Sequence, residues 1–357
     1  MGQHGHRLAR KRGSMPGRAD LPVPSSLGVW WLVGGVAAVV GAVVLSLAVG
    51  PIRLSPLQVL RELLWFDNEL TNTEQAVLWQ LRLPRATLAL LVGASLAMAG
   101  AGYQGVFRNP LADPYFLGAA AGAGLGVTLV IVAGGATTSL ALPVAAFTGA
   151  LAAVALTYAL GAAGGQRMST TSLVLAGVAV ASFLTAVQTY LLQRQQDNLR
   201  QVYSWILGRL STAGWREVVI VLPYAVVTMA ILLAHRRVLD ILAVGDDEAA
   251  TLGVHPRRTR FVVVAVASLG TAAAVSVSGL IGFVGIVVPH TVRLLAGGSH
   301  RVVLPLSLLF GGAFLTLADL AAKMVSAPAE LPIGVVTAFF GAPFFVLVLR
   351  TTGRAIP

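Results

Sequence analysis

The sequence predicts an all-α membrane protein with about ten transmembrane helices, and three observations support this fold class. Hydrophobic residues make up 56% of the 357 residues and charged residues only 11%, far below the roughly 25% of an ordinary soluble domain. The chain contains a series of apolar runs, and a helix needs about 20 such residues to cross the hydrocarbon of a bilayer. The basic residues gather on one side of these runs, as the positive-inside rule requires.

The apolar runs define ten candidate spans, at residues 28–49, 83–105, 113–133, 140–163, 171–192, 215–234, 261–282, 283–296, 303–322 and 332–349. Hydropathy alone allows one span or two over residues 261–296, because glycines and Pro289 interrupt that stretch. We expect residues 1–26 to form a disordered basic cytoplasmic tail, since no clear cleavage site follows them. Residues 27–357 are then the transmembrane domain.

The distribution of charge predicts the orientation in the membrane. With the N-terminus in the cytoplasm and ten crossings, 16 of the 25 Lys and Arg residues lie inside and 9 outside, and both termini are cytoplasmic. We therefore expect a multi-pass protein of the inner or plasma membrane whose positive charge reflects topology. A nucleic-acid partner is not expected, because no aromatic-studded basic groove accompanies the charge. The chain has no cysteine, so the redox compartment cannot be inferred from it.

The glycines of "QGVFRNPLADPYFLGAAAGAGLG", residues 104–126, suggest helix packing. Gly118, Gly122 and Gly126 recur every four residues, which places them on one face of a helix where a neighbouring helix can approach closely. A phosphate-binding P-loop would need a lysine in the motif GxxxxGK[ST]. The two lysines, Lys11 and Lys323, do not lie in such a motif, so ATP binding by a P-loop is excluded.

The segment "RNPLADP" is expected to form a tight cytoplasmic hairpin. Asn109 and Asp113 each precede a proline, and Pro110 suits a first helical position because its missing N–H has no partner there in any case. Two interpretations remain open for the polar residues of this region. Either the segment only turns the chain, or Gln104 and Asn109 line a pathway, since polar groups at membrane depth usually face a bundle interior or a water-filled cavity.

Residues 235–260, "HRRVLDILAVGDDEAATLGVHPRRTR", are predicted to form two short amphipathic helices on the cytoplasmic side. Their apolar patches, Val238–Val244 and Ala249–Val254, are separated by a Gly-Asp-Asp turn. Docking to a soluble partner is favoured, and binding to the membrane surface is the alternative. Two further amphipathic surface helices are expected outside, at 54–66 and 196–211.

Four stretches in this order resemble the FecCD-type permeases of ABC importers for iron–siderophore complexes, haem and cobalamin. They are "LRLPRATLALLVGASLAMAGAGYQGVFRNPLADPYFLG", "GDDEAATLGV", "GLIGFVGIVVPHTVRLLAGGSHRVVLPLS" and "APAELPIGVVTAFFGAPFF". The resemblance implies a ten-span subunit with separate spans on either side of "GFVGIVVPH". It also implies a pair of permeases, expected to be a homodimer, that encloses one central pathway beside two ATPase subunits and an extracytoplasmic substrate-binding protein.

The resemblance also implies roles for individual residues. At the outer face it assigns docking of the binding protein to Arg82, Arg85 and Lys323, although the family more often has arginine at the third position. It assigns coupling to the ATPase to Gly245, Asp247, Ala250, Leu252, Gly253 and Val254. Apart from the resemblance, the candidate pathway or gate positions are Gln104, Asn109, Pro110, Pro289, His290 and Arg293.

These expectations describe a transport subunit without catalytic residues or a cofactor, with ATP hydrolysis on a separate ATPase subunit. A metal site at His290 is not expected, because no Cys, Asp or Glu stands at ligand spacing, whereas Asp319 and Lys323 are spaced to pair along a helix. The cargo is expected to be a chelated metal complex, with iron–siderophore favoured and cobalamin or haem as further candidates. The alternative is an ion-gradient-driven secondary transporter, which usually carries ionisable residues near the bilayer midplane.

Overall fold

The structure is a computed structural model that describes residues 27–50, 52, 54–64, 70–134, 140–163 and 170–352. These residues form helices and connecting loops without any strand. The helices are α1 (Val29–Ala48), α2 (Pro56–Leu63), α3 (Asn72–Ala76), the π-helix η1 (Val77–Arg82), α4 (Leu83–Phe107), α5 (Ala119–Val132), α6 (Ala141–Ala163), α7 (Thr170–Arg194), the short 3-10 helix η2 (Gln196–Asn198), α8 (Leu199–Ile206), α9 (Trp215–Ala234), α10 (Arg236–Val244), α11 (Asp246–Thr251), α12 (Pro256–Ser278), α13 (Val284–Ala296), α14 (His300–Met324) and α15 (Ile333–Thr352).

The helix lengths agree with a polytopic membrane protein. Within the described residues, seven helices are long and apolar enough to cross a membrane. Helices α5, α13 and α15 contain shorter apolar stretches. The expected tail at residues 1–26 lies outside the described residues.

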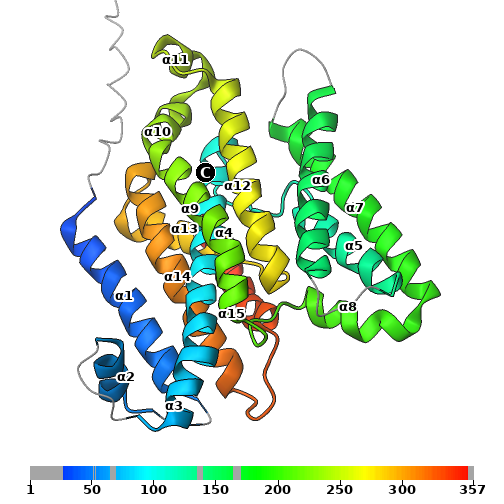
Figure 1. The fold of residues 1–357 in the computed structure, drawn as a ribbon. Helices are drawn as coiled ribbons and strands as arrows, with labels where there is room; N and C mark the ends of the chain where they lie inside the picture. The colour runs from blue at the N-terminus through cyan, green and yellow to red at the C-terminus, as the bar shows by residue number, and fades with distance from the viewer. Residues whose placement is uncertain are drawn as a thin grey trace, which may run out of the picture.

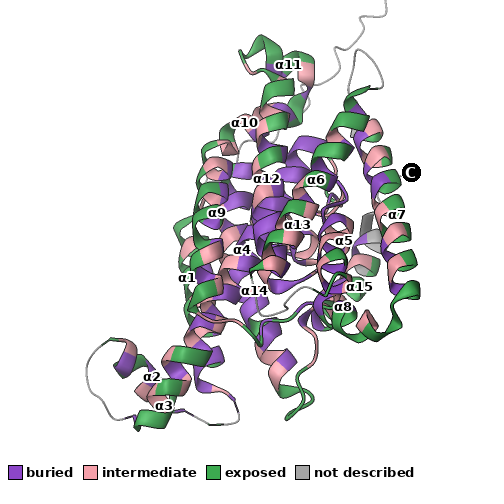
Figure 2. Ribbon diagram, turned by 45° about the vertical axis from the view of Figure 1, so that its right-hand side comes forward, coloured by how far each residue is buried: buried purple, intermediate pink, exposed green. Residues whose placement is uncertain are grey.

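Helices α4, α12 and α14 form the centre of the bundle, and the other long helices surround them (Figures 1 and 2). In the 18-residue apolar stretch of the segment that contains α4, 83% of the residues are buried. In the corresponding stretch of α7 only 22% are buried. The sequence explains this position, because α4 contains the run "GASLAMAGAG", whose small side chains let several neighbours approach its backbone closely.

Glycine-to-glycine contacts hold α4 against two neighbours. A Cβ atom added to Gly93 of α4 would lie 2.3 Å from the carbonyl oxygen of Gly311 in α14. A Cβ atom on Gly100 would lie 2.0 Å from the carbonyl oxygen of Gly285 in α13. No side chain fits at such distances, so α4, α13 and α14 touch backbone to backbone.

The prediction of glycine packing holds for two of the three glycines in residues 118–126. Cβ atoms on Gly122 and Gly126 would each lie 2.2 Å from a carbonyl oxygen of α6, so these residues form the α5–α6 contact. Gly118 is different, because it precedes α5 as its N-cap with φ of +80°. The reason is that residues 108–118 stay non-helical, so α5 begins only at Ala119 and not near Asp113.

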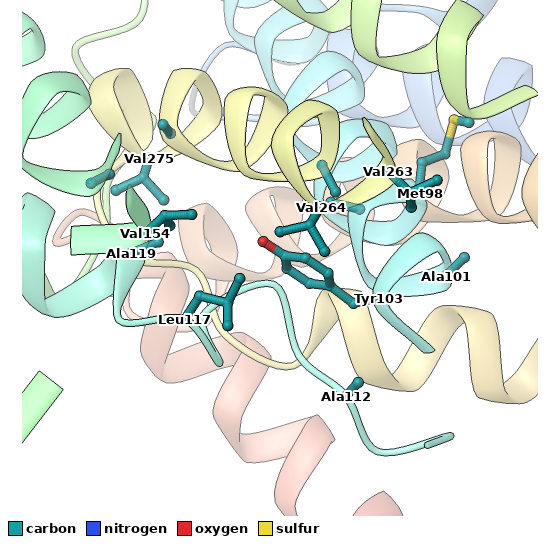
Figure 3. Close-up of a cluster of buried hydrophobic side chains, with 14 of the residues drawn as sticks. Met98, Ala101, Tyr103, Ala112, Leu117, Ala119, Val154, Val263, Val264 and Val275 are labelled. Carbon is teal, nitrogen blue, oxygen red and sulfur yellow. The ribbon is translucent and has the colours of Figure 1, made fainter. Parts of the chain in front are cut away.

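Figure 3 shows part of the apolar core between α4 and α12. The fully buried ring of Tyr103 in α4 lies among apolar side chains that include Val263 and Val264 of α12. Its hydroxyl group hydrogen-bonds Ser268 Oγ over 2.6 Å. The only polar group of this buried ring therefore has a partner, which removes the cost of burying it.

The stretch 261–296 contains two helices, α12 and α13, separated by residues 279–283. Gly279 has φ of +70°, a value that favours glycine. The backbone at this break has partners in other segments: Arg209 N donates to Ser278 O over 2.8 Å, and Ile281 N donates to Tyr115 Oη over 3.3 Å. Such pairing is required where non-helical backbone lies inside a membrane protein.

The bundle has two distinct ends. Helices α10 and α11 lie at one end and α2 and α3 at the other, and we call these the α11 end and the α2 end (Figure 1). The beginning of α1 lies toward the α11 end (Figure 1).

Candidate functional site at the two ends of the bundle

Four charged side chains join α4, α14 and the loop before α15 at the α2 end. The guanidinium of Arg85 donates to both oxygens of Asp319 over 2.9–3.1 Å. It also donates to both oxygens of Glu330, over 2.9 and 3.0 Å. Lys323 Nζ lies 2.8 Å from Asp319 Oδ2, which confirms the predicted pair. In this Arg85 cluster (Arg85, Asp319, Lys323, Glu330) two positive and two negative charges cancel.

Arg82 points away from this cluster and stabilises the end of α1. Its guanidinium donates to the carbonyl oxygens of Leu47 and Ala48, which the helix end leaves without intrahelical partners, and to that of Ile52 in the segment that follows. The residue is only 8% exposed. Arg82 and Arg85 are three apart in the sequence, a spacing that would place them on nearly the same side of an α-helix. They have different partners instead, because residues 77–82 form a π-helix and the α-helical spacing begins only after Arg82.

A recess beside the Arg85 cluster is lined by arginines that the sequence analysis did not single out. It has a volume of about 700 Å³ and receives Arg200, Arg209 and Arg216 from α8, the α8–α9 loop and α9. Arg200 and Arg209 also line an adjoining recess of about 430 Å³ that reaches Arg85. None of the three guanidinium groups forms an ion pair or hydrogen bond with the described part of the chain. The amphipathic pattern of residues 196–211 was the signal that pointed to this region.

Helices α10 and α11 project from the bundle at the opposite end, as the sequence predicted (Figure 1). The apolar side chains of the two patches fall into a buried group and an exposed group. Leu239, Leu242 and Ala249 are buried against the bundle. Val244 and Leu252 face outward, and Leu252 is 66% exposed. The turn after α11 uses Gly253 with φ of +79°.

The other residues assigned to this segment are mostly accessible. Asp247 and Ala250 are exposed, Val254 is half-buried and Gly245 is buried. Val244 and Leu252 are therefore the large apolar side chains of this segment that remain accessible to a partner.

Asp246 ties the segment to two membrane helices. Its carboxylate accepts from Arg260 of α12 over 2.5 and 2.8 Å and from Arg108, the C-cap of α4. The hydrogen bonds from Arg260, with the positive charges of both arginines, hold the pKa of Asp246 below its usual value. Because Arg108 is 138 residues from Asp246 in the sequence, no local pattern could have predicted this contact.

Asp240 ties α10 to the start of α14. Its carboxylate accepts hydrogen bonds from Ser299 Oγ over 2.7 Å, from the His300 backbone N–H over 2.6 Å and from His300 Nδ1 over 2.9 Å. Burial raises the pKa of Asp240, but the hydrogen bonds from His300 and Ser299 lower it by more than burial raises it. The pKa of Asp240 is therefore below its usual value. The sequence analysis did not identify this contact either.

The predicted pathway residues lie in two places near the α11 end. Gln104 is buried in α4, and its Nε2 donates to Gly285 O in α13 over 3.1 Å. Asn109 Oδ1 accepts from the backbone of Leu111 over 2.9 Å, which makes a local turn at Pro110. The gating role of these residues stays a prediction.

The remaining pathway candidates lie on α13. Pro289 is buried inside the helix, and the ring of His290 packs edge-on against Phe344 with centroids 5.9 Å apart. Two nitrogens of the Arg293 guanidinium are buried without a partner among the described residues. Within that part of the chain no three His, Asp or Glu side chains group as metal ligands.

Comparison with known proteins gives a consistent result over most of the chain. Residues 38–351 match the model of the FecCD transport family. The chain is 45% identical to the cobalamin import system permease protein of Halobacterium salinarum, over 78% of this chain and 74% of that protein. It is 38% identical to the Fe(3+) dicitrate transport system permease protein FecD of Escherichia coli, over 87% of this chain and 95% of that protein.

A solved structure has the same fold. It is described as an inward-facing conformation of a metal-chelate type ABC transporter. It superposes with a TM-score of 0.80 at 30% identity and covers 90% of this chain and 98% of its own.

Proposed function

The chain belongs to the FecCD transport family, and from this premise we propose that it forms the path by which an ATP-driven importer moves a chelated metal complex into the cytoplasm. Members of this family are multi-pass membrane permeases of ABC importers, in which the ATPase is a separate subunit. The observation that carries the proposal is the projecting α10–α11 segment, which exposes an apolar side chain and is tied by carboxylates to three central helices.

We propose ten crossings, by α1, α4, α5, α6, α7, α9, α12, α13, α14 and α15, with the α11 end in the cytoplasm. The first and last helices support an even number of crossings, because α1 begins toward the α11 end (Figure 1) and α15 begins after the loop that joins the Arg85 cluster at the α2 end. The excess of Lys and Arg on the same side supports the orientation.

The α11 end is the proposed docking site of the ATPase. Leu252 would enter an apolar cleft of that subunit, with Ala250 and Val254 beside it. The exposed Asp247 would remain at the polar rim, which is the usual arrangement of a protein interface. The tight turn at Gly253 would hold these side chains in place.

The α2 end is the proposed docking site of the extracytoplasmic substrate-binding protein. Arg85 and Lys323 contribute through the Arg85 cluster, and Arg82 contributes by fixing the end of α1 beside it. The unpaired guanidiniums of Arg200 and Arg209 in the adjoining recesses supply further positive charge for acidic side chains of that partner. Exposed charges of this kind mainly set orientation and association rate.

We further propose that two copies of this chain enclose the pathway. Phe339 and Phe340 of α15 are large, apolar and exposed, and in a dimer they would face the second copy. Gln104, Asn109 and the α13 residues His290 and Arg293 would then lie near the cytoplasmic gate.

The cargo follows by analogy with the relatives, which are named for cobalamin and Fe(3+) dicitrate. Both are metal complexes enclosed by an organic ligand. We propose a ferric siderophore as the first candidate for this chain, with cobalamin and haem as alternatives.

The test is uptake by vesicles that contain the permease, its ATPase and its binding protein. Labelled ferric siderophore, cobalamin and haem are supplied outside, with ATP inside. We expect one of the three to accumulate, and accumulation to stop when the ATPase carries a substitution in its Walker lysine. Uptake that survives this substitution and stops with ionophores would indicate a secondary transporter instead.

A further inference from the structure

Asp240 caps a membrane helix from outside that helix. Ser299 and His300 are the N-cap and the first residue of α14, and the carboxylate of Asp240 accepts hydrogen bonds from both. Carboxylates are favoured at helix N-termini, where backbone N–H groups have no intrahelical partner. Here the cap comes from α10, so α10 cannot shift relative to α14 without losing it. We call these three residues the Asp240 clamp.

The helix held by the clamp is tightly joined to α4. The imidazole of His300 lies against Gly105 of α4, where an added Cβ atom would come within 2.5 Å of His300 Nε2. Further along, Gly93 and Gly311 bring the two backbones into direct contact. The contact at Gly93 and Gly311 leaves no side chain between the two backbones to absorb a displacement, and closely packed interiors transmit strain.

The far end of the same helix pair carries the Arg85 cluster. Arg85 lies on α4, and Asp319 and Lys323 lie on α14. Each helix has 25 residues, which corresponds to about 37 Å at 1.5 Å per residue. The Asp240 clamp and the Arg85 cluster are therefore the two ends of one rigid pair of helices.

We propose that Asp240 transmits the movement of α10 to α14 and α4, which carry it as one body to the Arg85 cluster at the opposite face. This inference rests on the proposed function, in which an ATPase moves α10 and an extracytoplasmic protein docks at the α2 end. Asp240 is then a positioning residue. Because coupling between two sites is reciprocal, docking outside would change ATP hydrolysis inside through the same carboxylate.

The first test is Asp240→Ala in the complete complex. We expect the ATPase to co-purify and to hydrolyse ATP at the wild-type basal rate. ATP-driven uptake should fall about tenfold or more, a typical size for coupling between sites, and stimulation of hydrolysis by the binding protein should disappear. Arg237→Ala, an exposed position on the same helix, is the matched control and should retain both. Wild-type uptake by Asp240→Ala, or loss of the ATPase from the complex, would overturn the proposal.

The second test restores the link by other means. The chain has no cysteine, so Asp240→Cys with Ser299→Cys introduces the only two thiols. In the reduced state this variant should hydrolyse ATP without uptake. A short reducible bifunctional thiol reagent should restore uptake and stimulation, and subsequent reduction should abolish them again.

The outcomes separate this inference from the proposed function. If the cross-linked complex stays inactive, α10 and α14 must part during the cycle and the clamp does not transmit movement. If the wild-type complex takes up no chelate at all, the proposed function fails instead.

Discussion

Each end of the bundle contains a carboxylate that pairs with two cations, but the two carboxylates differ in their exposure to solvent. Asp319 is shared between Arg85 of α4 and Lys323 of its own helix, and Asp246 between Arg108 and Arg260 of other segments. The side chain of Asp319 is 1% exposed and that of Asp246 is 43% exposed. Burial is therefore the main difference between the two contacts.

Burial decides how easily each contact can open. A buried carboxylate that loses its partners is left as an uncompensated charge in a medium of low dielectric constant. An exposed carboxylate that loses its partners is solvated by water instead. The Arg85 cluster is therefore suited to a permanent joint between α4, α14 and the loop before α15. The Asp246 contacts can break and re-form, as a segment that moves with a soluble partner requires.

The largest expected effect comes from removing the buried carboxylate. Asp319→Ala leaves Arg85 and Lys323 at the same site with only Glu330 to balance them. Breaking a buried ion pair in this way costs about 3–5 kcal/mol. The loss should appear in the free energy of unfolding measured by SDS titration in mixed micelles, and as reduced yield of folded protein.

The control for this prediction is Glu330→Gln in the same cluster. Its side chain is 38% exposed, so the loss should stay below about 1 kcal/mol. Equal losses for the two variants would mean that burial does not distinguish these carboxylates, and the comparison between the two ends would lose its basis.

The sequence predicts the fold class and the segments much better than the contacts between them. Hydropathy identifies most of the helices and glycine spacing identifies the packing of Gly122 and Gly126, because each of these depends on residues close together in the chain. Hydropathy leaves the break between α12 and α13 open, and only the family resemblance implies it. The amphipathic pattern of residues 235–260 likewise predicts α10 and α11.

The ion pairs between distant segments could not be predicted in the same way. Asp246 meets Arg108 across 138 residues, and Arg85 meets Asp319 across 234 residues, so no local pattern contains both partners. Arg82 shows a second limit. Its sequence spacing from Arg85 suggests a shared face, but the π-helix before it changes the direction of its side chain. Only the packing of α1 against that turn fixes where Arg82 points.

The second prediction tests whether the α11 end affects function without affecting stability. Leu252 is exposed and takes part in neither ion network, so Leu252→Asp should leave the free energy of unfolding within about 0.5 kcal/mol of wild type. Placing a carboxylate in an apolar docking cleft should nevertheless reduce ATP-driven uptake about tenfold or more, since this needs only about 1.4 kcal/mol of docking energy. Thr251→Asp next to it is the control for charge alone. Unchanged uptake for Leu252→Asp would remove Leu252 from the proposed ATPase contact.

The substitution with the smallest expected effect is at Asp246. The dependence of this effect on pH and salt tests whether it arises from the exposed ion pairs of Asp246. The pKa of Asp246 in the folded protein is lowered, chiefly by its hydrogen bonds to Arg260. Its contribution to stability is therefore fully present above the ordinary carboxyl pKa, near 3.9, and is lost as the pH falls through the lowered folded value. At neutral pH, Asp246→Asn should cost less than about 1 kcal/mol, because the pair is exposed and screened by ions.

Two titrations of the unfolding free energy check this origin. The difference between wild type and Asp246→Asn should shrink between 0.05 and 0.5 M salt, over which the screening length falls from roughly 14 to 4 Å. It should also shrink below about pH 4. Asp319→Asn should show a larger difference that salt barely changes, because water and ions do not reach that carboxylate. A salt-insensitive difference at Asp246 would place its contacts in a buried environment and would contradict the assignment of the α11 end as the exposed, reversible one.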